Sequence, residues 1–220
     1  MSLLERSWGS FSQGLAGRYL KTYGHPSLSS KQLLVDVLEE LARNRARVGK
    51  RRLNILELGC GNAQLYEYFK ERKLACTYTG IDFSAPLLEV ARENHAGDDA
   101  ARFIADDIVE LSEIEERFDV AVYSHVLEVL SSPEHSLRRA RELAPIVVIR
   151  FFEPPDFDVD TVELREMEVT DADEARTVPY IRWKLSRDHY RLMLTRTGCS
   201  KVEIYRDAAS KDQVHVLHYD

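Results

Sequence analysis

The chain has 220 residues, which is enough for one large α/β domain or two small ones. A hydrophobic fraction of 44% and a charged fraction of 30% are typical of a folded, water-soluble protein. The net charge of −7 excludes a global attraction to nucleic acid or to an anionic membrane. Three cysteines without framework spacing, and no early apolar run of signal-peptide character, lead us to expect a cytoplasmic protein.

The N-terminal region is predicted to form a helical cap over residues 1–50. Residues 1–28 are irregular, with at most a short helix near residues 15–23. Ser29 or Ser30 begins a clear helix, because apolar residues recur on one face. The basic run 43–52 suits the helix C-terminus and solvent better than an RNA-binding patch.

Strands and helices alternate from residue 53 onward. The predicted strands are 53–59, 76–82, 101–107, 118–124 and 145–152, and the predicted helices between them are 63–72, 84–94 and 132–143. Strands separated by helices of this length predict parallel pairing with right-handed crossovers. Residues 51–155 would therefore be a doubly wound core.

The pattern changes after residue 155. Residues 156–185 alternate like two exposed strands and predict an inserted antiparallel hairpin over 160–185. Residues 186–220 predict a closing helix that ends at Gly198 and two final strands. No internal repeat or linker marks a boundary, so we expect one domain over 1–220. The hairpin would cover a pocket or join two subunits in a homodimer.

The turn after the first strand reads "LELGCGNA", with Glu57 just before Gly59 and Gly61. A loop that holds phosphate offers backbone N–H groups, and a carboxylate there would repel the ligand. A nicotinamide fingerprint also needs a third glycine, where this chain has Gln64. Asp82 is the acid about twenty residues further on that either kind of nucleotide ligand would require. The charges favour S-adenosylmethionine, which has no phosphate and carries an ammonium and a sulfonium.

Four segments in order then resemble the motifs of the class I S-adenosylmethionine-dependent methyltransferases. They are "LELGCGNA", "GIDFSAPLLEVARE", "ADDIVEL" and "FDVAVYSHVLEVLSSPE", within a match from about Asn54 to Arg150. The resemblance implies a Rossmann-like seven-stranded mixed sheet whose last strand is antiparallel, with helices on both faces. It also implies S-adenosyl-L-methionine as cofactor and S-adenosyl-L-homocysteine as product.

The resemblance implies roles for the residues at the strand ends. Gly59 and Gly61 would let the cofactor approach the backbone, and Glu57 would face its methionine end. Asp82 would hold the ribose hydroxyls, and Phe83 would lie against the adenine. The remaining cofactor-binding candidates are Asp107 on the adenine amino group, Asp106 as its alternative, Ile108 through its N–H, Ser124, and Arg18 on the cofactor carboxylate.

The expected reaction is in-line transfer of the methyl group to a nitrogen or oxygen nucleophile of a small molecule. Candidates for a catalytic base are His125, Tyr23 and Glu153, although His125 could equally be a packed histidine. No His, Asp and Glu cluster has metal-ligand spacing. Alternatives are a protein or RNA acceptor, a nicotinamide-dependent oxidoreductase and an inactive methyltransferase-like partner subunit. Neither a nucleic acid nor a membrane is an expected partner.

Overall fold

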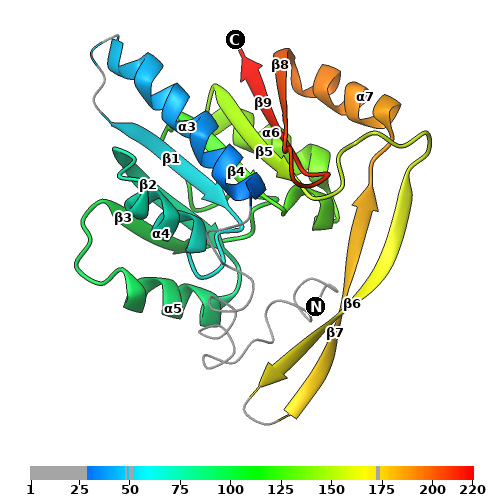
Figure 1. Ribbon diagram of the computed structural model, residues 1–220, viewed down its shortest axis with the longest axis horizontal. Coiled ribbons are helices and arrows are strands. Elements are labelled where there is room, and N and C mark those ends of the chain that lie inside the picture. The colour runs from blue at the N-terminus through cyan, green and yellow to red at the C-terminus, as the bar shows by residue number, and fades with distance from the viewer. Residues whose placement is uncertain (1–28, 48, 50–51, 172–173) are drawn as a thin grey trace.

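The computed structural model describes residues 29–47, 49, 52–171 and 174–220. Its main feature is one seven-stranded sheet in the order β3-β2-β1-β4-β5-β9-β8 (Figure 1). The strands are β1 (Leu53–Leu58), β2 (Cys76–Asp82), β3 (Ala101–Ala105), β4 (Val120–Ser124), β5 (Ile146–Phe151), β8 (Cys199–Arg206) and β9 (Gln213–Tyr219). From β1 the chain proceeds outward to β2 and β3, and it then returns to the centre at β4 and continues toward the other side of the sheet. The direction of the strand order therefore reverses between β1 and β4.

Strands β1 to β5 pair in parallel, whereas β9 pairs antiparallel with both β5 and β8. This confirms the predicted mixed sheet with an antiparallel last strand. Parallel strands place their carboxyl ends at one edge, so the turns after β1, β2, β3 and β4 meet there. The reversal point between β1 and β4 is where a ligand crevice is expected in such a sheet.

Helices cover both faces of the sheet (Figure 1). Among the described residues, three helices pack on one face: α3 (Ser29–Arg47), α4 (Gln64–Glu71) and α5 (Ala85–Asn94). Two pack on the other: α6 (Pro133–Leu143) and α7 (Arg187–Thr197). A short 3-10 helix, η1 (Leu127–Val129), follows β4. The two faces have separate apolar cores, because successive side chains of a strand point to opposite sides.

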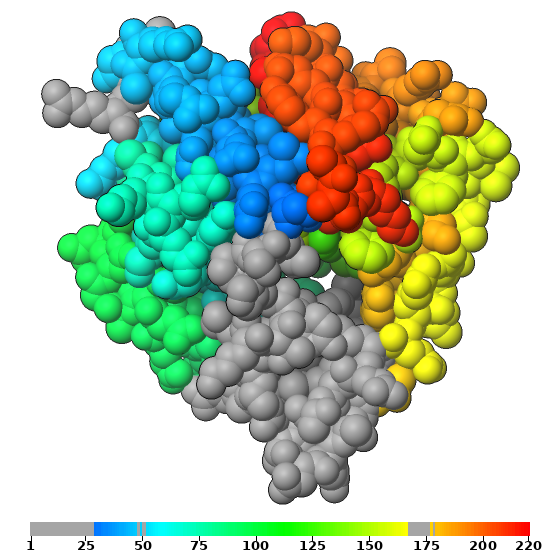
Figure 2. Space-filling view, viewed as in Figure 1, coloured from blue at the N-terminus to red at the C-terminus, as the bar shows by residue number. Residues whose placement is uncertain are grey.

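Helix α3 confirms the predicted helix, and its apolar face holds Leu34, Val35 and Leu38 without exposed surface. Its N-terminal end contacts the β8–β9 pair, and Figure 2 shows the two segments side by side on the surface. Ser29 Oγ donates to Asp207 Oδ2 at 2.6 Å. This contact brings the start of α3 to the edge of the sheet where the strand-end turns gather.

The predicted hairpin forms a separate two-stranded sheet, β6 (Thr161–Asp171) with β7 (Glu174–Lys184). The ribbon extends away from the seven-stranded sheet (Figure 1). Its base contacts η1. Val162 and Leu164 lie on one face and are 49% and 68% exposed. Helix α7 ends at Gly198, whose φ of 75° is the left-handed conformation that glycine adopts at no cost.

No helix among the described residues is both long and apolar enough to cross a membrane.

Candidate active site

The turn after β1 is a tight backbone cradle. Gly59 has a φ of 78°, and its N–H donates to the Ile81 carbonyl at 2.8 Å. A Cβ built on Gly59 would lie 2.8 Å from Cγ2 of Val126, which belongs to the turn after β4. Glycine is therefore required here both by conformation and by space. The close approach joins the two turns that flank the reversal point of the sheet.

Asp82 at the end of β2 is tied to this cradle. Its Oδ2 accepts the Gly61 N–H at 2.8 Å, and its Oδ1 accepts the Ser84 N–H at 2.9 Å. The side chain is 8% exposed, and burial raises its pKa while the backbone hydrogen bonds lower it. The backbone N–H of Phe83 is a third donor to this carboxyl, which keeps acceptor capacity for a ligand hydroxyl. The next residue, Phe83, is half-buried.

Glu57 lies beneath the cradle. Its Oε2 accepts from the Tyr78 hydroxyl at 2.5 Å, and the residue is 3% exposed. Burial raises its pKa to about 8, against the opposing effects of the Tyr78 hydrogen bond and the charges of Lys31 and Arg150. The carboxyl therefore acts as a buried link between neighbouring strands. The role expected for Glu57, at the methionine end of the cofactor, stays a prediction.

The two acids after β3 have different environments. Asp106 uses both oxygens inside its own turn, with Oδ1 accepting from Asp107 N and Ser112 Oγ and Oδ2 accepting from Glu113 N. Asp107 is exposed and accepts one N–H, that of Val109, at 2.8 Å. Ile108, next to it, is buried. Of the two acids, Asp107 has the position from which a ligand could be reached.

The turn after β4 begins with Ser124, which is half-buried, and continues with His125 in the left-handed conformation at φ 60°. Nδ1 of His125 lies 3.0 Å from Nη2 of Arg150, and Nε2 lies 3.0 Å from Oδ2 of Asp212. A guanidinium only donates, so Nδ1 is the acceptor and the proton sits on Nε2, which donates to Asp212. Burial lowers the pKa of His125 to about 4.

His125 is thus a neutral histidine with both nitrogens occupied, joining β4, β5 and the start of β9. In this arrangement it orients the turn, and no ring nitrogen is left to take a proton from an acceptor. Arg150 and Asp212, its two partners, are 4% and 6% exposed.

The segment after β5 builds a mixed aromatic and charged wall. The ring of Phe152 contacts His125 edge-on, with 5.6 Å between the centroids. Arg182 and Lys211 lie over the Phe152 ring, with their charged groups at 4.4 and 5.1 Å from the centroid. Nζ of Lys211 also donates to Oε1 of Glu153 at 2.7 Å. Glu153, a candidate base, is therefore buried and paired with a lysine whose side chain is 57% exposed.

Arg18 and Tyr23 lie outside the described residues.

Several polar residues of this region were not predicted as site residues. They are Lys31, Glu128, Arg150, Arg182, Lys211 and Asp212. Two of them carried a signal in the sequence, since Arg150 interrupts the apolar run of β5 and Glu128 interrupts the apolar run after β4. A charge inside such a run is rarely buried without a partner. The others come from distant parts of the chain, and only the sheet order brings them together.

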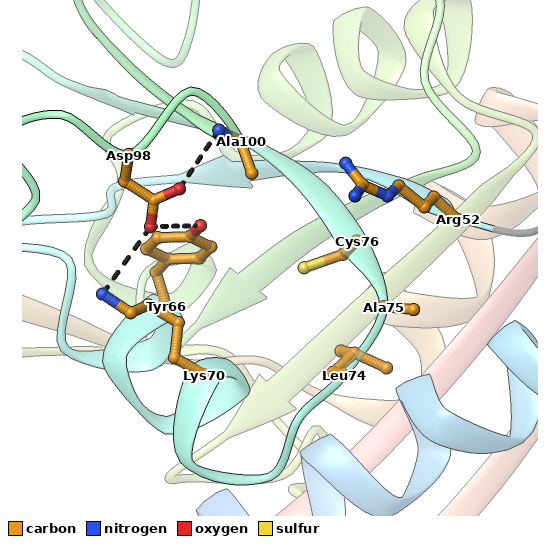
Figure 3. A pocket seen from close by; sticks show the side chains of 8 residues that line it. All are labelled: Arg52, Tyr66, Lys70, Leu74, Ala75, Cys76, Asp98 and Ala100. Carbon is orange, nitrogen blue, oxygen red and sulfur yellow. Dashed lines mark hydrogen bonds and ion pairs between the residues drawn. The ribbon is translucent and has the colours of Figure 1, made fainter.

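A pocket of about 280 Å³ lies at the opposite edge of the sheet (Figure 3). It is lined by Arg52, Tyr66, Lys70, Leu74, Ala75, Cys76, Asp98 and Ala100. Asp98 accepts from the Tyr66 hydroxyl at 3.0 Å and pairs with Lys70 at 3.6 Å. The pocket adjoins the amino ends of β1, β2 and β3, so it is separate from the strand-end cradle. Within the described residues, no group of His, Cys, Asp and Glu could hold a metal ion.

The strand-end residues suit a nucleoside that lacks phosphate. Asp82 offers a fixed carboxyl for vicinal hydroxyls, and Asp107 offers an exposed acceptor for an amino group. The cradle at Gly59 lets a ligand approach the backbone closely. No cationic side chain among the residues predicted for this cradle would neutralise a pyrophosphate, within the part of the chain that is described.

Comparison with known proteins agrees with this geometry. Residues 56–145 match the family model of a methyltransferase domain. A search of curated protein sequences found no significant match. The CcbJ methyltransferase from Streptomyces caelestis has 17% identity and a TM-score of 0.64, with 95% of this chain and 99% of that chain covered.

Two further solved structures are similar. CalS10 of Micromonospora echinaspora, an amino pentose methyltransferase solved with bound S-adenosylmethionine, has 15% identity and a TM-score of 0.66, covering 92% of this chain and 97% of its own. The glycopeptide N-methyltransferase MtfA has 17% identity and a TM-score of 0.58, covering 83% of this chain and 90% of its own. The chain therefore has the Rossmann-like fold of these methyltransferases, and residues 56–145 are similar to a methyltransferase domain.

Proposed function

We propose that this protein transfers the methyl group of S-adenosylmethionine to a nitrogen or oxygen nucleophile of a small molecule. One observation carries the proposal: the cradle at Gly59 is closed by Val126 and tied to Asp82, at the reversal point of a methyltransferase-type sheet. Vicinal ribose hydroxyls are the groups that a carboxyl held in this way suits best. S-adenosylmethionine would supply an electrophilic methyl group on a sulfonium.

The residues of this chain would hold the cofactor at three points. Asp82 would accept from the ribose hydroxyls, Asp107 would accept from the adenine amino group, and the N–H of Ile108 would face the adenine ring. Glu57 would act from below, by fixing β1 against β2 through Tyr78. Phe83 would lie against the adenine.

The acceptor would bind against the wall built by Phe152, His125 and the base of β7. Aromatic walls enclose flat or apolar molecules and favour a nearby sulfonium through cation–π attraction. Alignment and exclusion of water are the main contributions that such an enclosed site makes to methyl transfer. The acceptors named for CalS10 and MtfA, an amino pentose and a glycopeptide, support a small-molecule amine as the first class to examine.

The proposal is tested by incubating the purified protein with S-adenosylmethionine and a panel of small amines, amino sugars and phenols. Formation of S-adenosylhomocysteine and of a product heavier by one methylene unit is followed by mass spectrometry. We expect turnover with at least one acceptor and its loss in Asp82→Asn. Turnover that appears only with protein or RNA added would contradict the small-molecule assignment.

A further inference from the structure

Glu128 is a buried acid that the site described above leaves unexplained. It lies in η1 and is 2% exposed. Its Oε1 accepts the N–H of Phe152 at 2.9 Å, which fixes the carboxyl plane against the exit of β5. Its Oε2 is buried and has no hydrogen-bond partner among the described residues. A buried carboxyl oxygen without a partner requires an explanation, because leaving it so costs about 1–3 kcal/mol.

A second buried group without a complete set of partners stands close by, on the base of the hairpin. Nη2 of Arg182 donates to the Tyr180 hydroxyl at 3.1 Å, and its guanidinium stacks on Phe152. Nε of Arg182 is buried and has no hydrogen-bond partner in the described part of the chain. The charge of Arg182 acts on Glu128, yet no hydrogen bond joins Oε2 to Nε. One acceptor, on the carboxyl hydrogen-bonded to the Phe152 N–H, and one donor, on the guanidinium over the Phe152 ring, therefore remain unused.

We propose that Glu128 Oε2 and Arg182 Nε are the polar anchors of the methyl acceptor, and that the acceptor is an amine with an oxygen on the neighbouring carbon. This inference rests on the proposed function and narrows its substrate class. The amine donates to Oε2, the neighbouring oxygen accepts from Nε, and the carbon skeleton lies on Phe152. A plain amine would satisfy one anchor and a plain diol would leave the carboxylate without a cation.

Entry to this site requires one movement. Arg182 is half-buried and covers Phe152 from the hairpin side. Its side chain has to leave the ring before an acceptor can reach Oε2, and it then closes over the bound molecule. The hairpin base thereby couples acceptor binding to enclosure of the site.

Glu128 also accounts for the proton that an amine must lose. The bound ammonium passes a proton to Oε2, so an N–H bond breaks, an O–H bond forms, and the electron pair stays on nitrogen. That pair forms the new N–C bond, while the pair of the S–C bond remains on sulfur and the sulfonium becomes a neutral thioether. The proton on Glu128 then leaves to solvent, and the product departs as a methylated ammonium.

The environment of Glu128 favours this step. Burial raises the pKa of its carboxyl to about 8, opposed by the hydrogen bonds from Phe152 and Glu153 and by the charge of Arg182. The charge of Asp212 raises the pKa of Glu128 further. The nearby carboxyl of Glu153 pairs with Lys211. An ordinary Glu, near pKa 4.3, is a far weaker base toward an ammonium near pKa 10. The approaching ammonium itself favours the ionised carboxyl.

The test uses three probes of one shape on the full chain loaded with S-adenosylhomocysteine. They are trans-2-aminocyclohexanol, cyclohexylamine and trans-cyclohexane-1,2-diol, and their affinities are measured by ligand-observed NMR titration. The wild type should bind the amino alcohol at least tenfold more tightly than either of the other two. Glu203→Gln, which changes an acid on the edge strand β8, is the control and should leave this order unchanged.

Two variants assign the anchors separately. Glu128→Gln keeps an acceptor for the Phe152 N–H and should abolish the preference for the amino alcohol over the diol. Arg182→Met keeps the apolar stem on Phe152 and should abolish the preference for the amino alcohol over cyclohexylamine. A third readout is the carboxyl ¹³C shift of Glu128, which should report ionisation when the amino alcohol binds.

Equal binding of all three probes, or an unchanged order in Glu128→Gln, would overturn the inference. A protein that binds S-adenosylhomocysteine but shows no preference for the amino alcohol would retain the proposed function and lose the inference. A protein that does not bind S-adenosylhomocysteine would lose the proposed function and the inference together, whatever its order of preference among the probes.

Discussion

Gly59 and Val126 are in contact across the reversal point of the sheet, and a single carbon added to Gly59 would lie 2.8 Å from the valine Cγ2. Gly59 directly follows the first strand and Val126 lies in the turn after the fourth, so 67 positions of sequence separate two residues that form one wall. The same valine follows His125, whose ring is fixed by Arg150 and Asp212. The turn after β4 therefore joins the cradle at Gly59 to the His125 ring and its partners.

Gly59→Ala should destabilise the fold by about 2–4 kcal/mol, because it adds left-handed strain to an overpacked contact. Gly97→Ala is the matched control, since Gly97 has a φ of 81° and nothing within 4 Å of the added Cβ. Urea unfolding at pH 7 measures both. Combining Gly59→Ala with Val126→Ala should recover part of the loss. Equal effects of the two glycine changes would show that the contact with Val126 has no energetic weight.

Glu57→Gln should become more stable relative to the wild type as the pH rises from about 5 to 8. The folded-state pKa of Glu57 is raised from 4.5 to about 8, so over this range the unfolded chain releases a proton that the folded chain keeps. The ionisation of Glu57 therefore lowers the free energy of unfolding of the wild type as the pH rises, by up to about 1.4 kcal/mol per pH unit. Glutamine has no such proton. Urea unfolding at pH 5, 6, 7 and 8 gives the difference between variant and wild type.

A constant deficit of the Glu57→Gln variant at every pH would mean that Lys31 and Arg150 keep the carboxyl ionised.

Buried neutral histidines produce the opposite pH dependence. Burial lowers the pKa of His215 from 6.5 to about 4, and the ring is held by the Tyr190 hydroxyl and Gln213. Below pH 6.5 the unfolded chain binds a proton that the folded chain excludes, so stability falls as the pH falls from 6.5 toward 4. His215→Gln should remove about 2 kcal/mol of this loss between pH 6.5 and 5.

The control for His215 is His135→Gln, whose side chain is 47% exposed. Unfolding by urea at the two pH values should give the same slope for His135→Gln and the wild type. If the free energy of unfolding of His215→Gln changes with pH as steeply as that of the wild type, the assignment of a neutral buried ring is wrong.

The exposed apolar face of the hairpin gives a prediction about assembly. If β6 and β7 join two copies of the chain, replacing Val162 and Leu164 by glutamate places charges on the interface. The double variant should sediment as a monomer where the wild type sediments as a dimer, with unchanged binding of S-adenosylhomocysteine. If the wild type is a monomer even at high protein concentration, the hairpin does not join two copies of the chain, and only its proposed role beside the acceptor site remains.

The order of strands and helices was predictable because apolar residues recur in each element with the spacing typical of a strand or of a helix. The hairpin, for example, was predicted over 160–185 and is observed as β6 and β7 between Thr161 and Lys184. The hydrogen bond from the Tyr78 hydroxyl to Glu57 was not predictable. A central parallel strand is buried on both faces, so apolar alternation no longer indicates which side chains face the ligand. The link from His125 to Asp212 spans 87 positions and depends on the sheet order, which local sequence does not specify.

The most direct test of the account is calorimetric titration of the wild type and of Asp82→Asn with S-adenosylhomocysteine. We expect one site per chain in the wild type and a loss of at least about 2 kcal/mol, roughly thirtyfold, in Asp82→Asn, since ribose hydroxyls lose a charged acceptor. Asp98→Asn, in the pocket at the other edge of the sheet, should bind like the wild type. Binding of NADH without any heat from S-adenosylhomocysteine would contradict the account.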